Sequence, residues 1–396
     1  MRSVLISSFD MEVGGVERSL ISMLNNFDYE NNKVDLMLYS HTGDFMNLLP
    51  KEPTLLQENK KYATFRRGIG QLIRSGELNI AFCRLLAKFR AKQVSKKMNL
   101  SEAGCVQMQL MWKYALHFLP NLEKEYDVAI SYLWPHYFIA EKVKAKKKIA
   151  WIHTDYSTID TNIEMDLKIW NKFDNIVSIS KDCTDAFLKK YPSLKSKIIL
   201  IENITSPEFV RKMSEENVED DISEYDGFKI VSTGRLCYPK AFDNAVKALR
   251  ILHDKGLTDI KWYIVGYGPD EELIRNLIKE NNLEDSFILL GKKVNPYPYM
   301  KDCDLYVQPS RYEGRAVTVT EAQILGKAVI ITNYPTAKSQ LKDGFDGYIT
   351  DLSIKGIVHG IEKLYNNKDF RRELSYNCKN TDYSNKKELE NLYRLF

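Results

Sequence analysis

The sequence predicts an α/β protein with two domains, each built on a parallel sheet. Its 396 residues are too many for one ordinary core. Short apolar runs alternate with helical patterns almost from end to end, which is typical of parallel strands joined by crossover helices. A polar, acidic segment at 205–228 separates the halves and indicates a linker. We therefore expect domains at 1–205 and 206–396, with a last helix that either closes the second domain or crosses back to the first.

Eleven apolar runs are predicted as strands, because they are short, rich in β-branched and aromatic residues, and suited to burial on both faces. In the first half they are Val4–Ser7, Val34–Leu38, Val128–Leu133, Lys148–His153, Asn175–Ile179 and Lys197–Ile201. In the second half they are Lys229–Thr233, Trp262–Val265, Phe287–Leu290, Leu305–Gln308 and Ala328–Thr332. Residues 60–120 and 355–396 carry helical patterns instead, and the first of these segments is rich in Lys and Arg.

The composition is that of a soluble globular enzyme, with 44% hydrophobic and 28% charged residues. Its six cysteines form no CxxC pair, which argues against a metal cluster or a disulfide framework and favours a reducing cytoplasm. The apolar run in MRSVLISSFD is too short for a signal peptide or a membrane span. We expect a cytoplasmic protein without a metal cofactor.

Two glutamates, Glu313 and Glu321, flank a predicted strand-to-helix turn in the stretch SRYEGRAVTVTEAQI. The turn places the first at the mouth of the sheet and the second about one and a half turns into the helix, so both can reach one ligand. The first amides of the helix are unpaired donors at the positive end of its dipole and suit a diphosphate. They belong to Ala316, Val317 and Thr318. A nucleotide-sugar would fit this pattern.

Two cations follow another predicted strand, in the stretch VSTGRLCYPK. Arg235 comes directly after a glycine turn, and Lys240 opens the next helix. A guanidinium fork and an ammonium at the carboxyl end of a strand suit phosphate oxygens. The alternative is that Arg235 pairs with a carboxylate of the chain and Lys240 is merely solvated. The glutamate pair on a neighbouring strand favours phosphate binding.

Three further positions come after predicted strands. Gly14 and Gly15 precede a helix, where backbone can approach an anion closely, although a plain tight turn explains them equally. His153 ends the strand KKIAWIH and suits a hydrogen bond to a sugar hydroxyl or a phosphate, or a purely structural one. The segment from Gly291 to Lys293 could offer backbone groups to a nucleobase.

Basic residues cluster in the first half, which carries a net charge of about +6 against about −2 for the second. The clusters are Arg66–Arg67, then Arg84, Lys88, Arg90, Lys92, Lys96 and Lys97, and finally Lys142, Lys144, Lys146, Lys147 and Lys148. Spacing at 84, 88 and 92 predicts a cationic stripe on one helix face, suited to an anionic bilayer, or else a solvated face. No recognition motif accompanies the charge, so we expect no nucleic acid.

These elements in this order resemble the retaining glycosyltransferases of family 4, over nearly the whole chain. The resemblance is strongest in STGRLCYPK, IVGYGPDEELI and PYPYMKDCDLYVQPSRYEGRAVTVTEAQILGKAVI, which is similar to the Glu-x7-Glu signature of that family. It implies the GT-B fold, two facing Rossmann-like domains with a cleft between them. It also implies transfer of a hexose or N-acetylhexosamine from a nucleotide diphospho-sugar, UDP-sugar above all. The acceptor would be a glycan or a polyprenyl-diphosphate-linked saccharide in capsule or exopolysaccharide synthesis, at the inner face of the membrane.

By the same resemblance, Arg235 and Lys240 would bind the diphosphate, Glu313 the donor sugar and Glu321 the ribose. The loop residues Gly314, Arg315, Ala316, Val317 and Thr318 would line the donor, Gly291 and Lys293 the base, and His153 the sugar. Gly14 and Gly15 would form the amino-terminal glycine loop. Two positions depart from the family pattern: Arg315–Val317 replace an aromatic-glycine-leucine run, and Ala241 stands where glycine is common.

Cleavage of a sugar–phosphate bond leaves negative charge on the nucleotide, which Arg235, Lys240 and the helix amides would stabilise in place of a metal ion. Two alternatives stay open. One is a non-catalytic partner subunit or glycan-binding chaperone of the same fold. The other is a nucleotide-sugar epimerase or a phosphorylase-like enzyme, for which the chain lacks the expected acid-base pairs and length.

Overall fold

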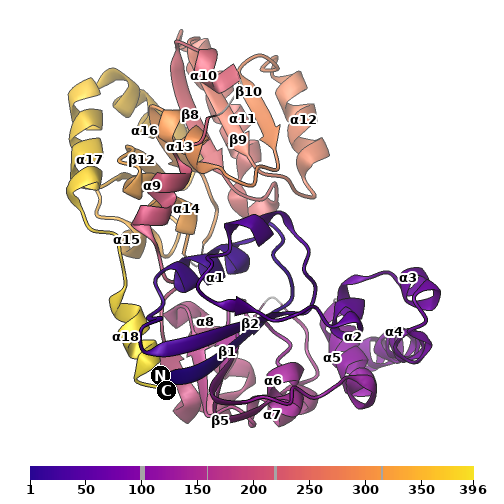
Figure 1. Cartoon of the computed structure of the whole chain (residues 1–396). Helices are drawn as coiled ribbons and strands as arrows, with labels where there is room; N and C mark the ends of the chain where they lie inside the picture. The colour runs from indigo at the N-terminus through magenta and orange to yellow at the C-terminus, as the bar shows by residue number, and fades with distance from the viewer. Residues whose placement is uncertain (99–102, 158, 218–220, 314) are drawn as a thin grey trace. The chain divides into compact units, whose positions relative to one another are not determined.

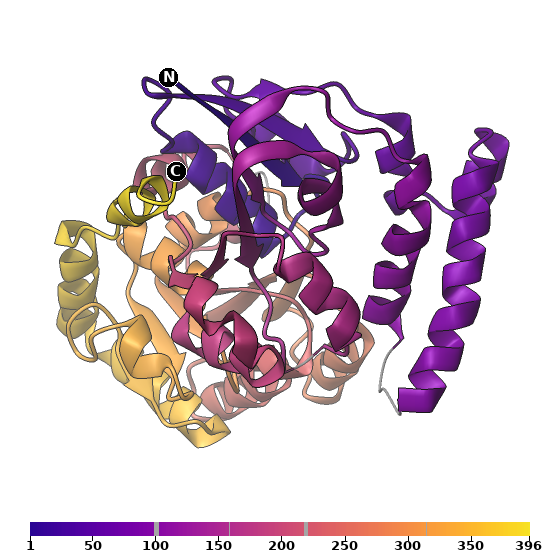
Figure 2. The ribbon, with the colours of Figure 1, turned by 90° about the horizontal axis from the view of Figure 1, so that it is seen from below.

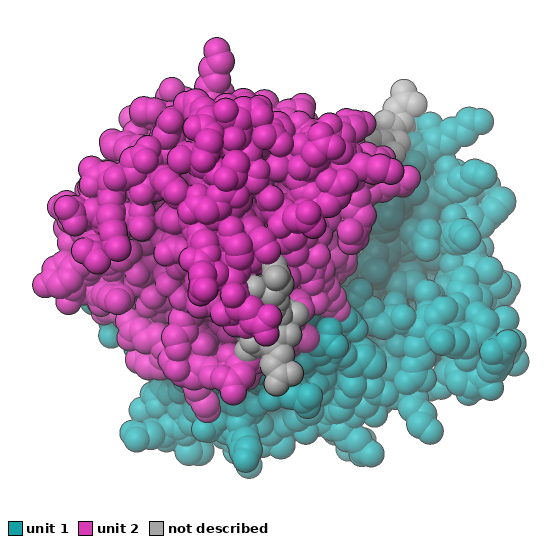
Figure 3. Space-filling view, turned by 90° about the horizontal axis from the view of Figure 1, so that it is seen from above, with its two compact units in different colours: residues 1–205, 385–396 teal, residues 206–384 magenta. Residues whose placement is uncertain are grey.

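The computed structural model describes residues 1–98, 103–157, 159–217, 221–313 and 315–396. These residues form two compact units (Figures 1 and 3). Unit 1 comprises residues 1–205 and 385–396, and unit 2 comprises residues 206–384. Each unit contains a parallel sheet between helices, so the expected α/β class with two parallel sheets is confirmed.

The sheet of unit 1 has the strand order β3-β2-β1-β4-β5-β6-β7, and all neighbouring strands run parallel. Its strands are β1 (Arg2–Ser8), β2 (Asn32–Leu38), β3 (Thr54–Leu55), β4 (Glu125–Ser131), β5 (Lys144–Ile152), β6 (Asn175–Ser178) and β7 (Ile198–Leu200). All six strands expected in this half are present. The additional strand β3 has two exposed residues, too few for a hydrophobic pattern to reveal.

The helices of unit 1 include a group between β3 and β4 that corresponds to the basic helical segment of the sequence. This group consists of α2 (Lys60–Ala63), α3 (Ile69–Arg74), α4 (Leu78–Met98) and α5 (Gly104–Ala115). The others are α1 (Gly15–Asn25), α6 (Tyr137–Lys142), α7 (Ile163–Trp170), α8 (Lys181–Lys190) and α18 (Lys387–Tyr393). Short 3-10 turns lie at η1 (Asp44–Leu48), η2 (Thr64–Arg66), η3 (Leu116–Phe118) and η4 (Pro192–Lys197).

Helix α18 belongs to unit 1 although it follows the whole of unit 2 in the chain. The Tyr393 hydroxyl accepts a hydrogen bond from the Asp28 amide at 2.7 Å, and its ring lies 5.3 Å from that of Phe27. The Thr205 amide donates to Asn385 Oδ1 at 2.8 Å, so the points where the chain leaves and re-enters unit 1 are bonded together. The two ends of the chain therefore close one unit (Figure 1).

The sheet of unit 2 has the order β10-β9-β8-β11-β12-β13, again parallel throughout. Its strands are β8 (Phe228–Thr233), β9 (Ile260–Val265), β10 (Phe287–Gly291), β11 (Leu305–Gln308), β12 (Val329–Thr332) and β13 (Tyr348–Thr350). The strand order reverses between β8 and β11. In open sheets of this kind, ligands bind beyond the carboxyl ends of the strands at the point of reversal.

Helices pack on this second sheet through apolar faces. They are α9 (Pro207–Met213), α10 (Asp221–Glu224), α11 (Phe242–Asp254), α12 (Glu271–Glu280), α13 (Tyr297–Asp302), α14 (Val317–Ile324), α15 (Ala337–Gln340), α16 (Ile354–Asn366) and α17 (Lys368–Asn380), with a 3-10 turn at η5 (Tyr238–Lys240). The core between sheet and helices is closed by residues such as Trp262, Ile264 and Leu249, all fully buried. Among the described residues, this core leaves no room for a ligand between the sheet and these helices.

The composition of the segment 205–228 predicts a linker. The structure instead has two helices of unit 2 there, α9 and α10. Ser206 caps α9 by accepting a hydrogen bond from the Phe209 amide, and Pro207 occupies the first turn. Val210 and Met213, three residues apart, are buried on one face of α9. The capping pattern and this short apolar repeat outweigh the acidic composition that follows them.

Candidate active site

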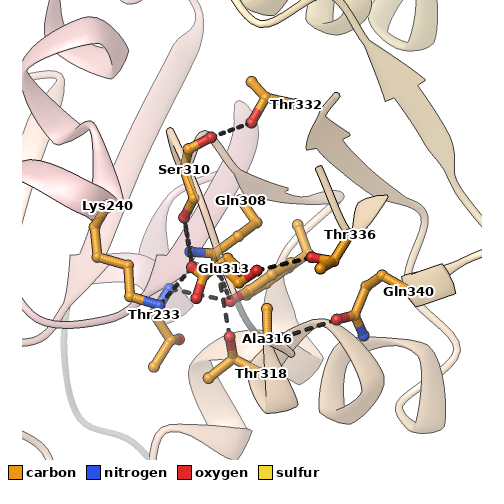
Figure 4. A network of polar contacts seen from close by, with 11 residues as sticks. Thr233, Lys240, Gln308, Ser310, Glu313, Ala316, Thr318, Thr332, Thr336 and Gln340 are labelled. Carbon is orange, nitrogen blue, oxygen red and sulfur yellow. Dashed lines mark hydrogen bonds and ion pairs between the residues drawn. The ribbon is translucent and has the colours of Figure 1, made fainter. Parts of the chain in front are cut away.

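A polar network lies where β8 and β11 end, at the reversal of the strand order in unit 2 (Figure 4). Its centre is the carboxylate of Glu313, whose side chain is 10% exposed. The oxygen Oε1 accepts hydrogen bonds from Lys240 Nζ at 2.6 Å, Ser310 Oγ at 2.6 Å and Gln308 Nε2 at 3.2 Å. Since all three donors contact Oε1, none of them occupies Oε2.

The donors around Glu313 are themselves fixed by the strand ends. Gln308 closes β11, and its Oε1 accepts from the Tyr306 hydroxyl at 3.0 Å and from Thr318 Oγ1 at 3.3 Å. These bonds determine which way the amide points, so that Nε2 faces Ser310 and Glu313. Burial raises the pKa of Tyr306, which keeps its hydroxyl a donor at any physiological pH.

Two threonines hold the backbone of the loop after β11. Thr332 Oγ1 donates to the Ser310 carbonyl at 2.5 Å, and Thr336 Oγ1 donates to the Glu313 carbonyl at 2.8 Å. Thr332 ends β12 and Thr336 precedes α15, so the loop is tied to the next two elements of the chain. The position of Glu313 is therefore set by both its side chain and its backbone.

The loop after β8 carries Arg235 and Lys240, the two cations predicted for phosphate. Lys240 ends the turn η5 and reaches the Glu313 carboxylate. Arg235 is exposed, and it makes no hydrogen bond or ion pair with the residues that the structure describes. The alternative to phosphate binding was that Arg235 pairs with a carboxylate of the chain and Lys240 is solvated. In the structure it is Lys240 that pairs with a carboxylate, that of Glu313.

Arg311 joins the two loops. Its backbone amide donates to the Pro239 carbonyl at 2.7 Å, and its guanidinium makes two bonds to the Asp243 carboxylate, at 2.6 and 2.9 Å. Burial of Asp243 opposes its ionisation, but the hydrogen bonds and the charge of Arg311 outweigh that effect and lower its pKa. The sequence contains no motif that marks Arg311, because its role depends on a partner 68 positions away.

Ala241, the residue after Lys240, adopts a left-handed conformation with φ of 55°. A side chain in that region costs roughly 1–2 kcal/mol, whereas glycine adopts it readily. Ala241 stands where glycine is common in the family that the chain resembles. The left-handed backbone gives a physical reason why glycine suits this position.

The glycines Gly266 and Gly268 serve backbone packing. A Cβ on Gly268 would lie 2.3 Å from the Leu236 carbonyl oxygen, and one on Gly266 would lie 1.9 Å from that of Gly234. The Leu236 amide donates to the Tyr267 carbonyl at 3.0 Å, which binds the loop after β9 to the loop that carries Arg235. The glycines are therefore needed for the site even though they bear no functional group.

The second glutamate, Glu321, lies inside α14 and is 2% exposed. The Tyr297 hydroxyl donates to its Oε1 at 2.8 Å. At the start of the same helix, the Ala316 amide is already bonded to Gln340 Oε1 at 2.8 Å, contrary to the expectation that it is unpaired. Val317 and Thr318 occupy the first turn. Arg315 is exposed, and the predicted contact Gly314 lies outside the described residues.

Gly291 and Lys293, predicted to lie against a base, follow the end of β10. Gly291 has a φ of +72°, and no atom lies within 4 Å of the place a Cβ would take. Its carbonyl accepts from the Gly266 amide at 2.9 Å. Lys293 Nζ lies 5.3 Å from the centre of the Tyr299 ring. This open backbone is joined to the loops that carry Arg235 and Lys240.

His153 belongs to unit 1, just beyond β5. Its ring lies 4.5 Å from that of Tyr132, and Nε2 is buried without a hydrogen-bond partner in the described part of the chain. Burial lowers the pKa of His153 to about 3, so the imidazole is neutral at physiological pH. His136 nearby has the same property, with a pKa of about 3 and a hydrogen bond between Nδ1 and Ser131 Oγ at 2.8 Å.

Gly14 and Gly15 begin α1 in unit 1, as expected. A Cβ on Gly14 would lie 2.3 Å from Oε2 of Glu17, because that side chain folds back over the start of the helix. Burial raises the pKa of Glu17. In this structure a carboxyl group of the chain itself therefore covers the backbone at Gly14, whereas no atom lies within 4 Å of the place a Cβ would take on Gly15.

The basic clusters differ in how far they are neutralised. Arg66 pairs with Asp10 at 2.5 Å, and Arg67 pairs with Glu58 at 3.2 Å. Arg84 turns inward and donates from Nη1 to the Thr64 and Arg67 carbonyls at 2.6 and 2.5 Å, so the predicted stripe of residues 84, 88 and 92 does not include it. In the third cluster, Lys144 and Lys146 pair with Glu125 and Asp127.

None of the helices among the described residues has the length and hydropathy that a membrane span requires. Across the same residues, no three or more His, Cys, Asp or Glu side chains are grouped as metal ligands would be.

Comparison with protein families gives a match for residues 214–381 to the model described as glycosyl transferases group 1. An uncharacterized glycosyltransferase of Methanocaldococcus jannaschii is 25% identical over 281 residues, which are 65% of this chain and 70% of that protein. A Campylobacter jejuni enzyme is 30% identical over 44% of this chain and 45% of its own length. It is named as a 4-alpha-N-acetylgalactosaminyltransferase acting on an N-acetylgalactosamine-N,N'-diacetylbacillosaminyl-diphospho-undecaprenol. Residues 214–381 are thus similar to the glycosyl transferases group 1 family.

The fold also matches solved structures over the full chain. The Anabaena protein HepE, in its complex with UDP-glucose, superposes with a TM-score of 0.66 at 15% identity, covering 100% of both chains. At this identity the likeness concerns the fold alone. It confirms the GT-B class expected from the sequence.

Proposed function

We propose that this chain is a retaining glycosyltransferase of family 4 that uses a UDP-sugar and adds a hexose or N-acetylhexosamine to a glycan or a lipid-linked saccharide. The observation that carries the proposal is the Lys240–Glu313 pair at the reversal of the strand order in unit 2, with the exposed cation Arg235 on the same loop as Lys240. A cation suits the diphosphate, and a carboxylate suits sugar hydroxyls. The two groups contact each other directly at 2.6 Å, so a ligand that carries both a phosphate and a sugar can reach both.

Arg235 and Lys240 would take up the charge of the departing nucleotide diphosphate. Preorganised donors of this kind stabilise the transition state, and loss of one typically lowers the rate about 10²–10³-fold. In our proposal these cations replace a divalent metal. Arg235 supplies the planar fork that suits two phosphate oxygens, and Lys240 supplies a compact charge.

Glu313 would hold the donor sugar through Oε2, while Oε1 stays bound to Lys240, Ser310 and Gln308. The acceptor hydroxyl would then attack the anomeric carbon from the side of the leaving phosphate, forming the new glycosidic bond as the sugar–phosphate bond breaks and giving retention. The acceptor's proton would pass to the departing phosphate. Roles for Glu321 at the ribose, for Gly291 and Lys293 at the base and for His153 at the sugar stay predictions.

The acceptor class is supported by the Campylobacter jejuni relative, whose name specifies a diphospho-undecaprenol saccharide. We extend that class to this chain as a proposal and place it in the synthesis of a surface polysaccharide such as a capsule or exopolysaccharide. A lipid-linked acceptor would bring the enzyme to a membrane face.

The test is thermal stabilisation by UDP, GDP, ADP, CDP and their sugar conjugates, with and without EDTA. We expect one nucleotide family, UDP, to stabilise the protein by about 2.7 kcal/mol at 100 times its dissociation constant, regardless of EDTA. Glu313→Gln should keep this stabilisation by UDP and lose sugar transfer. Unchanged transfer by that variant would contradict the role of Glu313. Stabilisation by none of the nucleotides would favour a non-catalytic partner subunit.

A further inference from the structure

Helix α4 of unit 1 exposes a row of large apolar side chains. Leu78, Phe82, Leu85 and Phe89 are 60%, 66%, 49% and 61% exposed. Their spacing of four, three and four residues places them on one face of the helix. A row of this kind is normally buried, and where it is exposed it marks a surface that binds something apolar.

The outward orientation of the row is fixed by the opposite face of the helix. Ala87 and Ala91 are fully buried, and α4 packs there on α5. Arg84 anchors α4 through its bonds to the Thr64 and Arg67 carbonyls. Figure 2 shows α4 as the outer of these two long helices. The apolar row therefore faces outward from unit 1 because of how α4 is packed.

The charge of α4 is of one sign. Between Leu78 and Met98 the sequence has six Lys and Arg residues and no Asp or Glu. Lys92 and Lys96 continue the apolar row at the helical spacing, and Lys88 borders it. All three are exposed, and none pairs with a carboxylate in the part of the chain that the structure describes.

We propose that this face of α4 docks on an anionic lipid bilayer, with Phe82, Leu85 and Phe89 at the boundary between headgroups and acyl chains. An apolar row bordered by lysines is the pattern by which helices lie in that interface, where each cation adds attraction to anionic lipid. A second copy of the chain fits less well, because pairing two such faces would bring cations against cations. The inference rests on the proposed function only in that a lipid-linked acceptor gives the enzyme a reason to bind membranes.

The experiment is co-sedimentation of the full chain with vesicles of phosphatidylcholine alone and with vesicles containing about one third phosphatidylglycerol. We expect binding to the anionic vesicles that weakens with salt. Phe82→Ser with Phe89→Ser should weaken it tenfold or more, since each phenylalanine loses its buried apolar area. Lys88→Gln, Lys92→Gln and Lys96→Gln together should abolish the preference for anionic vesicles.

Tyr376→Ser is the matched control, because Tyr376 is 67% exposed but lies in unit 2, and it should bind like the wild type. The inference is overturned if the wild type ignores anionic vesicles or if the double phenylalanine variant binds equally well. A dimer in sedimentation that the same variant dissociates would assign the face to a second copy instead. Stabilisation by UDP in solution, measured on every variant, tests the proposed function separately from membrane binding.

Discussion

Lys240 and Glu313 form a mostly buried ion pair in unit 2, with side chains 21% and 10% exposed. Ion pairs on an open surface contribute little, because water and salt screen them. A pair that is mostly buried behaves differently, since removal of one partner leaves the other charge poorly solvated. The neutral donors Ser310 and Gln308 would remain on Glu313 and would compensate only in part.

Lys240→Met should therefore lower the free energy of unfolding of unit 2 by about 1–3 kcal/mol and weaken UDP binding more than uridine binding. Lys255→Met is the control, because its pair with Glu362 is 46% and 33% exposed and should contribute less than about 1 kcal/mol. Urea unfolding and calorimetry measure the two effects. Equal losses for UDP and uridine would remove the phosphate role of Lys240.

For single strands, the accuracy of the bounds predicted from sequence depended on how many apolar residues each strand has. The strands β8 and β11 were predicted to within one residue. The strands β4 and β5 begin three and four residues earlier than predicted, because their first residues are mostly charged. The strand β3 has only two residues, too few to show a pattern. The three-residue strand β13 was also not predicted, although β7, of the same length, was. Motif spacing placed Arg235, Lys240 and Glu313 after two predicted strands, and the structure brings Lys240 and Glu313 together.

The remaining contacts of the site could not be predicted, because they join residues far apart in sequence. Thr336 and Arg311 act through partners in other elements, and neither has a local signature. The direction of a long side chain is equally hidden: helical spacing placed Arg84 on a face of α4 but did not reveal the carbonyl groups that turn it inward.

The close packing of Gly268, in the loop after β9, against the Leu236 backbone can be tested by substitution. Gly268→Ala would place a methyl group 2.3 Å from backbone oxygen of Leu236, so the loop that carries Arg235 must move. We expect a loss of about 2–4 kcal/mol in unfolding free energy and weaker UDP binding. Gly70→Ala is the control: it lies in α3 with no atom within 4 Å, and should be neutral or stabilising. Wild-type stability for Gly268→Ala would contradict the packing role.

For the whole molecule, the two units should differ in their response to acid. His136 and His153 are both in unit 1, and burial lowers the pKa of each to about 3. An unfolded histidine has a pKa of about 6.5 and takes up a proton that the folded side chain refuses. Their contribution to stability is therefore present above about pH 6.5 and is lost as the pH falls toward 3.

Between about pH 6.5 and pH 3, each of these histidines should lower the free energy of unfolding by about 1.4 kcal/mol for every unit by which the pH falls. Burial raises the pKa of Glu17 and Asp166 in the same unit, which acts in the opposite direction, so variants are needed to isolate the histidines. Urea unfolding between about pH 6 and pH 4 gives the slope of the unfolding free energy against pH. This slope should be smaller for His153→Gln than for the wild type. The exposed His359→Gln of unit 2 should keep the wild-type slope, and a matching slope in both variants would contradict the assignment.

The return of the chain to unit 1 through α18 has a consequence for biosynthesis. Translation releases β1 to β7 first and then the whole of unit 2, yet Tyr393 and Phe396, whose rings contact Phe27, emerge only with residues 385–396. The amino-terminal unit is thus the first to be made and the last to be finished. Until then the apolar surface at Phe27 lacks these two rings on the nascent chain, while the inserted unit 2 already has every one of its residues.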